Sequence, residues 1–154
     1  MPNSSTPLAV ASNTDESTLA RCADGSWPIV MRQVSAIDVF LPLLYSRSTD
    51  KGISWSTPAV LPGLGSAVKS IDPKLMLLPN GTMVLIYGRP DQRLAFSPDG
   101  SGYNWSTSIV TYTDANETCP TSANSAIVAL EHNRLLQFGD YHGMTTPDPN
   151  GQGI

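Results

Sequence analysis

The sequence predicts an all-β protein, a β-propeller built from four-stranded antiparallel blades. Charged residues make up only 14% of the 154 residues, while the chain has 12 Gly and 13 Pro, a composition typical of turn-rich β proteins. Gly, Pro or Asn-Gly interrupts every apolar run within about ten residues, which argues against helices. Pairs of hairpins recur at a spacing of about 50 residues, the length of one propeller blade.

The hairpins follow one another in a fixed alternation along the chain. Three of them consist of an apolar strand, a short turn and a second apolar strand, and two loop-bearing hairpins lie between these three. We expect hairpins at about 17–32, 41–60, 73–90, 93–112 and 125–140, preceded by a flexible segment at 1–14. Two hairpins form one blade, so the chain supplies about two and a half blades.

Each of the three simple hairpins has a characteristic turn. Asp-Gly and Asn-Gly favour type I′ turns, in which both central residues have a positive φ. The strands beside the second turn, Leu75–Leu78 and Met83–Tyr87, are almost continuously apolar. We expect such strands to be buried on both faces between stacked blades. The turns are Asp24-Gly25, Asn80-Gly81 and His132-Asn133.

The two remaining hairpins carry related loops, SRSTDKGISWSTP at 46–58 and FSPDGSGYNWSTS at 96–108. Each loop has one Asp and no closing Glu, which excludes a helix–loop–helix calcium site. We expect a structural role: the Asp accepts backbone hydrogen bonds, the Ser bonds across the loop, the Gly adopts a positive φ and the Trp packs between sheets. These residues are Ser48, Asp50, Gly52 and Trp55 in the first loop, and Ser97, Asp99, Gly102 and Trp105 in the second.

Charge and composition restrict the partners of the protein. The formal net charge is −4 and basic residues form no stripe, so nucleic acid is not expected as a partner. No apolar run approaches the roughly 18 residues of a membrane span, and no cofactor or metal is implied. The N-terminus lacks a signal-peptide pattern, but an excess of Asn-x-Ser/Thr sites favours a secreted or extracellular protein. Cys22 and Cys119 either form a disulfide or are two buried thiols.

The loop at Ser48–Trp55 matches S-x-D-x-G-x-x-W and resembles the Asp-box, or BNR repeat, of the sialidase (neuraminidase) superfamily. The second loop resembles it with one residue inserted between Asp99 and Gly102. The resemblance covers roughly 15–140 and implies a six-bladed propeller in the full-length form. The chain then looks like an N-terminal fragment, inactive by itself, whose exposed blade faces favour association.

The same resemblance implies an exo-α-sialidase with a retaining mechanism, acting on a carbohydrate or glycoconjugate. Sialidases hold the substrate carboxylate with three arginines and use an Asp as acid/base, with a Tyr nucleophile supplied by later blades. The stretch MRQVSAIDVF resembles the family segment in which a pocket arginine precedes this Asp. The resemblance therefore implies that Arg32 binds substrate and that Asp38 is the acid/base.

The first arginine of the family pattern is missing, because Glu16 occupies its approximate place before the Asp24-Gly25 turn. A carboxylate there repels the carboxylate of sialic acid. Two alternatives therefore remain open: a propeller glycosidase acting on another sugar, with Glu16 as a polar or catalytic group, and a non-catalytic propeller that binds glycan or protein. Further candidates for substrate binding are residues at strand ends that converge near the propeller axis, namely Arg89, Asp72 and Asp140.

Overall fold

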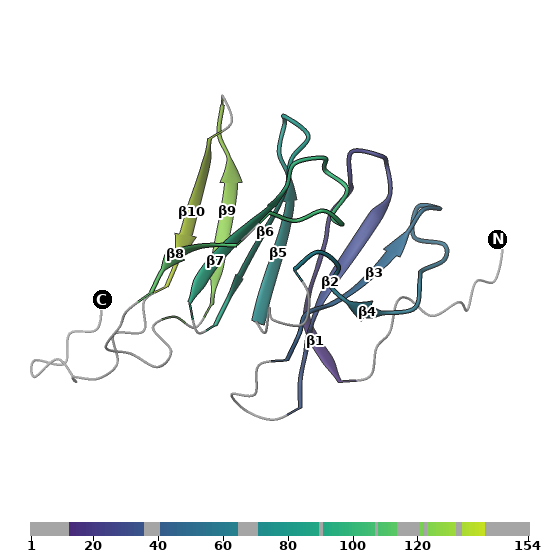
Figure 1. Cartoon of the computed structure of the whole chain (residues 1–154), viewed down its shortest axis with the longest axis horizontal. Coiled ribbons are helices and arrows are strands. Elements are labelled where there is room, and N and C mark those ends of the chain that lie inside the picture. Colours follow the sequence, from purple (N-terminus) through teal and green to yellow (C-terminus); the bar gives the residue numbers. More distant parts are fainter. Residues whose placement is uncertain are drawn as a thin grey trace, which may run out of the picture.

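The structure is a computed structural model of the chain. It describes residues 13–35, 41–64, 71–89, 91–106, 108–113, 121, 123–131 and 134–140. All regular elements within these ranges are β-strands, arranged in three antiparallel sheets (Figure 1). The strands are β1 (Thr14–Leu19), β2 (Trp27–Gln33), β3 (Leu44–Ser48), β4 (Ala59–Val60), β5 (Ile71–Leu77), β6 (Met83–Gly88), β7 (Gln92–Ser97), β8 (Ile109–Tyr112), β9 (Ser125–Ala129) and β10 (Leu135–Gly139).

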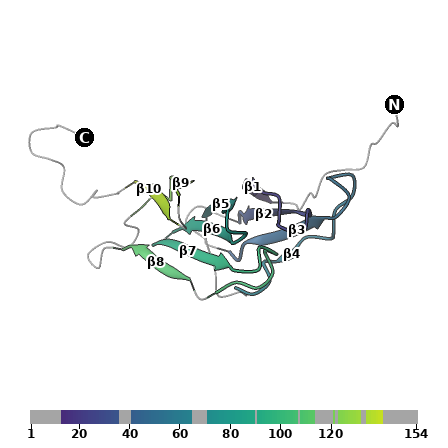
Figure 2. The same ribbon diagram turned by 90° about the horizontal axis from the view of Figure 1, so that it is seen from above.

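Each sheet is an up-and-down sheet whose strands follow the order of the chain. The first blade is β1-β2-β3-β4, the second blade is β5-β6-β7-β8, and the third-blade hairpin is β9-β10. The three units lie side by side, with the second blade in the middle (Figures 1 and 2). This arrangement confirms the predicted fold class of an all-β, blade-forming chain; six blades in a full-length form remain a prediction.

The middle blade is buried on both faces, as its continuous apolar strands predict. Along β6, Leu85 and Tyr87 pack against the first blade, whereas Val84 and Ile86 pack toward the third-blade hairpin. All four side chains are buried. Burial of one large apolar side chain contributes about 1.5–3 kcal/mol, so β6 stabilises the packing of all three units.

The outer face of the third-blade hairpin is different. Ile127, Ala129 and Leu135 pack against the second blade, but the alternate residues on the two strands point away from it. Phe138 is 57% exposed and Val128 is 48% exposed. The predicted exposure of an apolar blade face is therefore confirmed for this hairpin.

The hairpin turns depart from the prediction. Gly25 and Gly81 have a φ of 86°, but Asp24 and Asn80 do not have a positive φ. The N–H of Gly25 bonds to Cys22 O at 3.0 Å, and the N–H of Gly81 bonds to Leu78 O at 2.9 Å. The type I′ prediction is therefore wrong, because these are three-residue loops in which a type I turn precedes a Gly in the left-handed region. The third turn, His132-Asn133, lies outside the described residues.

The Asp and Asn of these turns act through their side chains. Asp24 Oδ1 accepts the N–H of Ser26 at 3.0 Å, and Asn80 Oδ1 accepts the N–H of Thr82 at 3.0 Å. A side-chain acceptor that bonds two residues onward closes the turn without requiring a positive φ at its own position. Asp24 and Asn80 therefore suit these turns because of their side-chain hydrogen bonds, and not because they adopt a positive φ.

Candidate functional site

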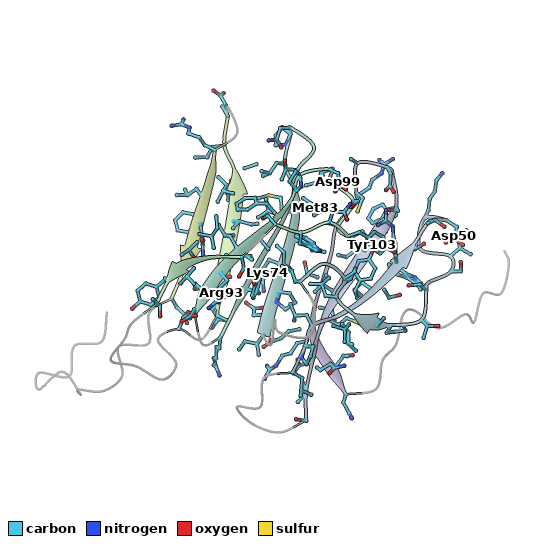
Figure 3. The ribbon with its side chains drawn as sticks, in the orientation of Figure 1. Asp50, Lys74, Met83, Arg93, Asp99 and Tyr103 are labelled. Carbon is cyan, nitrogen blue, oxygen red and sulfur yellow. The ribbon has the colours of Figure 1, made fainter. Side chains whose placement is uncertain are left out.

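Charged residues gather where β1 and β5 begin and where β2 and β6 end; we call this the charged end of the sheets. The hairpin turns and the Asp-box loops lie at the opposite end, the turn end. Figure 3 shows Lys74 and Arg93 toward the charged end and Asp99 toward the turn end. The charged cluster consists of Asp15, Glu16, Arg32, Asp72 and Lys74.

Glu16 and Asp72 occupy equivalent positions in the first two blades. Glu16 lies six positions before Cys22, and Asp72 lies six positions before Leu78. The N–H groups of Cys22 and Leu78 each donate a hydrogen bond across the hairpin turn of their blade. Glu16 and Asp72 both lie in a shift of strand register, between Asp15 and Ser17 in β1 and between Ile71 and Lys74 in β5. Both also have a positive φ, 27° for Glu16 and 47° for Asp72. Such bulges redirect a side chain and are common next to active sites.

The bulge in β1 also corrects the predicted start of the first hairpin. The expected hairpin begins at about residue 17, after a flexible segment at 1–14, whereas β1 begins at Thr14. Glu16 therefore lies inside a strand that pairs with β2. This position places its carboxylate next to Arg32.

Hydrogen bonds and ion pairs join the cluster across the two blades. Glu16 Oε1 lies 3.1 Å from Arg32 Nη1, and Glu16 Oε2 accepts the N–H of Asp72 at 2.8 Å. Asp15 Oδ1 lies 3.7 Å from Arg32 Nε, and the Asp72 carboxylate pairs with Lys74 Nζ. Three carboxylates thus surround two cations, which gives the cluster a net negative charge.

Arg32 is the arginine that the sequence assigns to substrate binding. Its side chain is 16% exposed, and two carboxylates of its own chain already contact its guanidinium group. A substrate carboxylate would have to displace or approach these groups against like-charge repulsion. Arg32 is thus already paired with carboxylates of its own chain.

The other predicted site residues are not all brought together. Asp38 lies outside the described residues. By alignment of the hairpin turns, the positions equivalent to Arg32 are Gly88 in the second blade and Asp140 in the third. Arg89 therefore lies one residue beyond the position equivalent to Arg32. Asp140 accepts a hydrogen bond from Thr121 Oγ1 at 2.8 Å.

Two members of the cluster were not predicted from sequence. Asp15 precedes Glu16 directly, and Lys74 follows Asp72 by two positions. Both are therefore charged neighbours, in sequence, of residues that were predicted. Their contacts depend on the bulges, which the sequence pattern does not reveal. No group of three or more His, Cys, Asp or Glu side chains suited to a metal ion occurs among the described residues.

The Asp-box loops have a shared hydrogen-bond pattern at the turn end. In the first loop Ser48 Oγ donates to Asp50 Oδ1 at 2.8 Å and accepts the N–H of Gly52 at 2.8 Å, and Trp55 Nε1 donates to Gly52 O at 3.1 Å. In the second loop the corresponding distances are 2.8, 3.1 and 3.0 Å for Ser97, Asp99, Gly102 and Trp105. The same internal hydrogen bonds therefore close both loops.

The serine and aspartate of each loop make hydrogen bonds that differ from those predicted. The buried Ser hydroxyl holds the N–H of the glycine, whereas Asp50 binds mainly the hydroxyls of Ser48 and Ser54 and a single N–H, that of Ser54. The prediction that the Trp packs between sheets holds for Trp105, which packs against the core between the first two blades. Trp55 is half-buried and lies outside both apolar core clusters.

The second Asp-box loop also contacts the first blade. Arg47 Nη1 donates to Ser101 O at 2.6 Å, and its guanidinium carbon lies 4.6 Å from the centre of the Tyr103 ring. Cys22, which is buried and free, donates its thiol to the same carbonyl at 3.3 Å. Burial raises the pKa of this thiol. Cys119 lies outside the described residues.

Comparisons with known proteins show the fold. No protein-family model and no curated protein sequence matches the chain. A protein of unknown function from Dyadobacter fermentans is similar with a TM-score of 0.68 and 19% identity, over 89% of this chain and 37% of that protein. At this identity the likeness shows a shared fold alone.

Two weaker structural similarities involve carbohydrate enzymes. A GH62 hydrolase in complex with xylotriose has a TM-score of 0.49 and 16% identity, over 71% of this chain and 33% of that enzyme. An α-L-arabinanase from Penicillium chrysogenum complexed with arabinobiose has a TM-score of 0.46 and 16% identity, over 79% of this chain and 38% of that enzyme. The chain thus spans between 33% and 38% of the length of these three proteins. In the part of the chain that the structure describes, no helix is suited to cross a membrane.

Proposed function

We propose that this chain forms part of a β-propeller glycoside hydrolase that acts on a neutral sugar. The observation that carries this proposal is the contact of Glu16 with both Arg32 and the backbone of Asp72. It presents a fixed carboxylate at the point where the first strands of two blades begin. In a propeller, these strands line the axis, where a substrate pocket forms between blades.

Glycoside hydrolysis usually requires two carboxyl groups with different roles. In this proposal Glu16 is the carboxylate that attacks the anomeric carbon in the retaining scheme, because two donors fix its orientation. Asp38 is the acid that protonates the leaving oxygen, the role that the resemblance to sialidases implies for it. Asp72 positions Glu16 through its backbone N–H, and Arg32 holds the other oxygen of Glu16.

The net negative charge of the cluster supports a neutral substrate. A sugar hydroxyl can donate to any of the three carboxylates, whereas a sugar carboxylate is repelled by them. The likeness to structures solved with xylotriose and arabinobiose suggests which glycosides to try first but adds no weight to the assignment.

The test is hydrolysis of fluorogenic glycosides by the purified protein, in its longest natural form. The panel contains an α-L-arabinofuranoside, a β-D-xyloside, a β-D-galactoside and an α-sialoside. We expect turnover of a neutral glycoside that falls at least about a thousandfold, roughly 4 kcal/mol, in Glu16→Gln. The matched control is Glu131→Gln, which changes an exposed Glu at the turn end. Equal activity of Glu16→Gln and wild type would exclude Glu16 from the chemistry.

A second candidate function, exo-α-sialidase activity, is favoured by the Asp-box loops. Both loops have the same Ser–Asp–Gly–Trp hydrogen-bond pattern, which supports the resemblance to sialidases in architecture but not in the site. The α-sialoside of the panel tests it, with Asp38→Ala alongside. Sialoside turnover that is lost in Asp38→Ala and retained in Glu16→Gln would favour this second candidate over the first.

A further inference from the structure

A polar pocket of about 250 Å³ lies between the second blade and the third-blade hairpin. Its walls come from the beginning of β7, the end of β8 and the end of β10. Because strands alternate in direction, all three positions belong to the charged end of the sheets. The lining residues are Gln92, Thr111, Tyr112, Gln137, Gly139 and Asp140.

The polar side chains of this pocket are connected to one another. Gln137 Nε2 donates to Thr111 Oγ1 at 3.0 Å and to Gln92 Oε1 at 3.5 Å. Gln92 Nε2 donates to Thr121 Oγ1 at 3.3 Å, and this hydroxyl donates to Asp140 Oδ1 at 2.8 Å. The network crosses from one blade unit to the other, so it fixes the pocket's donors and acceptors before any ligand arrives.

One member of this network, Gln92, is buried. Gln92 is 1% exposed and belongs to the lining of the pocket. A buried amide requires hydrogen-bond partners, so it costs stability unless the surrounding groups satisfy it. The Gln92 side chain packs on β10, where a Cβ built on Gly139 would lie 3.7 Å from the Gln92 amide carbon, an ordinary van der Waals contact.

We propose that this pocket is a subsite for a single neutral sugar ring, on strands other than those that carry Glu16 and Arg32. The inference rests on the proposed glycosidase function and names a second place where its substrate is held. Amide and hydroxyl groups both donate to and accept from sugar hydroxyls, and the Asp140 carboxylate accepts only. Among the residues that the structure describes, the lining contains one carboxylate and neither Lys nor Arg, so an anionic sugar is disfavoured.

The size of the pocket limits the ligand to one ring. Pockets for drug-sized ligands have volumes of about 300–1,000 Å³, and this pocket is smaller. Tyr112 on its wall supplies an aromatic surface with a polar tip, a combination that suits the apolar face and the hydroxyls of a sugar. The site therefore has the size and the chemistry of a monosaccharide subsite.

The test is an NMR titration of the isotope-labelled protein, followed through the side-chain amides of Gln92 and Gln137. The probes are D-galactose, L-arabinose and D-galacturonate, the last being the anionic counterpart of the first. We expect one of the neutral sugars to shift both amides saturably, with a Kd of about 1–10 mM. Gln137→Leu should weaken this binding at least about tenfold, whereas Gln33→Leu, the same change at the end of β2, should not alter it.

Each other outcome has a defined meaning, and circular dichroism shows that every variant is folded. Shifts confined to residues around Glu16 and Asp72 would overturn the subsite, leaving the pocket a hydrated gap between blades, while the proposed function stands. Equal binding of galacturonate and galactose would overturn the charge argument and with it the subsite. Saturable shifts at Gln92 in a protein without hydrolytic activity would support the subsite and contradict the proposed function. Glu16→Gln, which abolishes hydrolysis in the proposal, should leave pocket binding unchanged.

Discussion

The carboxylate of Glu16 accepts the backbone N–H of Asp72 at 2.8 Å, so one side chain connects the first strands of two neighbouring blades. The residues are equivalent in the two repeats, and both have a bulged backbone with a positive φ. A non-glycine residue in this conformation costs roughly 1–3 kcal/mol. Two acidic residues with this backbone conformation at matching positions indicate a functional site rather than a loop of arbitrary sequence.

Substitutions of Glu16 should separate its hydrogen bond from its charge. Glu16→Gln keeps an acceptor for the Asp72 N–H and loses a partly exposed ion pair, so the free energy of unfolding should fall by about 0.2–1 kcal/mol. Glu16→Ala also leaves that N–H unsatisfied, and its cost should be about 1–3 kcal/mol. Urea unfolding measures both changes against Glu131→Gln. Equal losses in the two variants would show that the backbone contact contributes nothing.

The repeat architecture was predictable because it follows from local patterns. The continuous apolar run at Met83–Tyr87 predicts a strand buried on both faces, and the structure confirms it. The Asp-Gly and Asn-Gly pairs place two turns correctly but not their type, because a side-chain bond of Asp24 or Asn80 competes with the positive φ that type I′ requires. The local sequence thus predicts the position of a turn more reliably than the type of turn.

The site was predictable only in part. The position of Glu16 was identified from its distance to a turn, but its bond to Asp72 joins residues 56 positions apart across two bulges. The polar pocket is even harder to predict from the sequence, because Gln92, Thr111 and Gln137 belong to three different strands and none lies in a recognisable motif. Contacts that depend on register shifts and on blade stacking cannot be derived from periodicity alone.

Gly100 should be less tolerant of substitution than the matching residue of the first Asp-box loop. That residue is Lys51, and the two have nearly equal φ values, 65° and 62°. A Cβ at Gly100 would clash with the carbonyl oxygen of Gly81 in the neighbouring turn. Gly100→Ala should therefore lower the free energy of unfolding by about 1–3 kcal/mol, whereas Lys51→Ala should change it by less than about 0.5 kcal/mol. Similar values in chemical denaturation would contradict the close packing of turn against loop.

The Asp-box loops should make stability depend on pH in the acid range. Hydrogen bonds from Ser54 and Ser48 lower the pKa of Asp50 from 3.8 to about 2, and bonds from Asn104, Ser101 and Ser97 lower the pKa of Asp99. Because both pKa values are lower in the folded state, this contribution is complete above pH 3.8 and is lost as the pH falls toward 2. The urea midpoint should therefore fall across this interval.

Single amide variants test the origin of that pH dependence. Asp50→Asn and Asp99→Asn each remove one titrating group, so each should flatten the fall of the urea midpoint between pH 3.8 and about 2. Asp91→Asn is the comparison, since it changes a carboxylate paired with Arg93 outside the loops. An unchanged pH profile in both loop variants would assign the acid sensitivity to other groups.

Arg47 should contribute strongly to the contact between the first two blades. It donates to Ser101 O at 2.6 Å and to Tyr45 Oη at 3.2 Å, and its guanidinium group lies over the ring of Tyr103. Arg47→Lys keeps the charge but loses the planar fork, so the free energy of unfolding should fall by about 1–3 kcal/mol. Arg93→Lys is the matched control, since its more exposed side chain pairs with Asp91. A cost no larger than that of the control would indicate that Arg47 is a surface ion pair only.

The pairing of Arg32 predicts how the preference of the site for charge could be changed. Glu16 Oε1 lies 3.1 Å from the guanidinium group, while Asp15 lies farther away at 3.7 Å. Glu16→Gln removes the nearer negative charge, so N-acetylneuraminate should bind at least about tenfold more tightly to the variant than to wild type, as measured by NMR titration. The double variant Glu16→Gln, Arg32→Gln should lose this gain, because the cation that attracts the sugar carboxylate is then absent. If wild type already binds N-acetylneuraminate as tightly as Glu16→Gln does, Glu16 does not exclude acidic sugars, and the exo-α-sialidase candidate becomes the better description of the site.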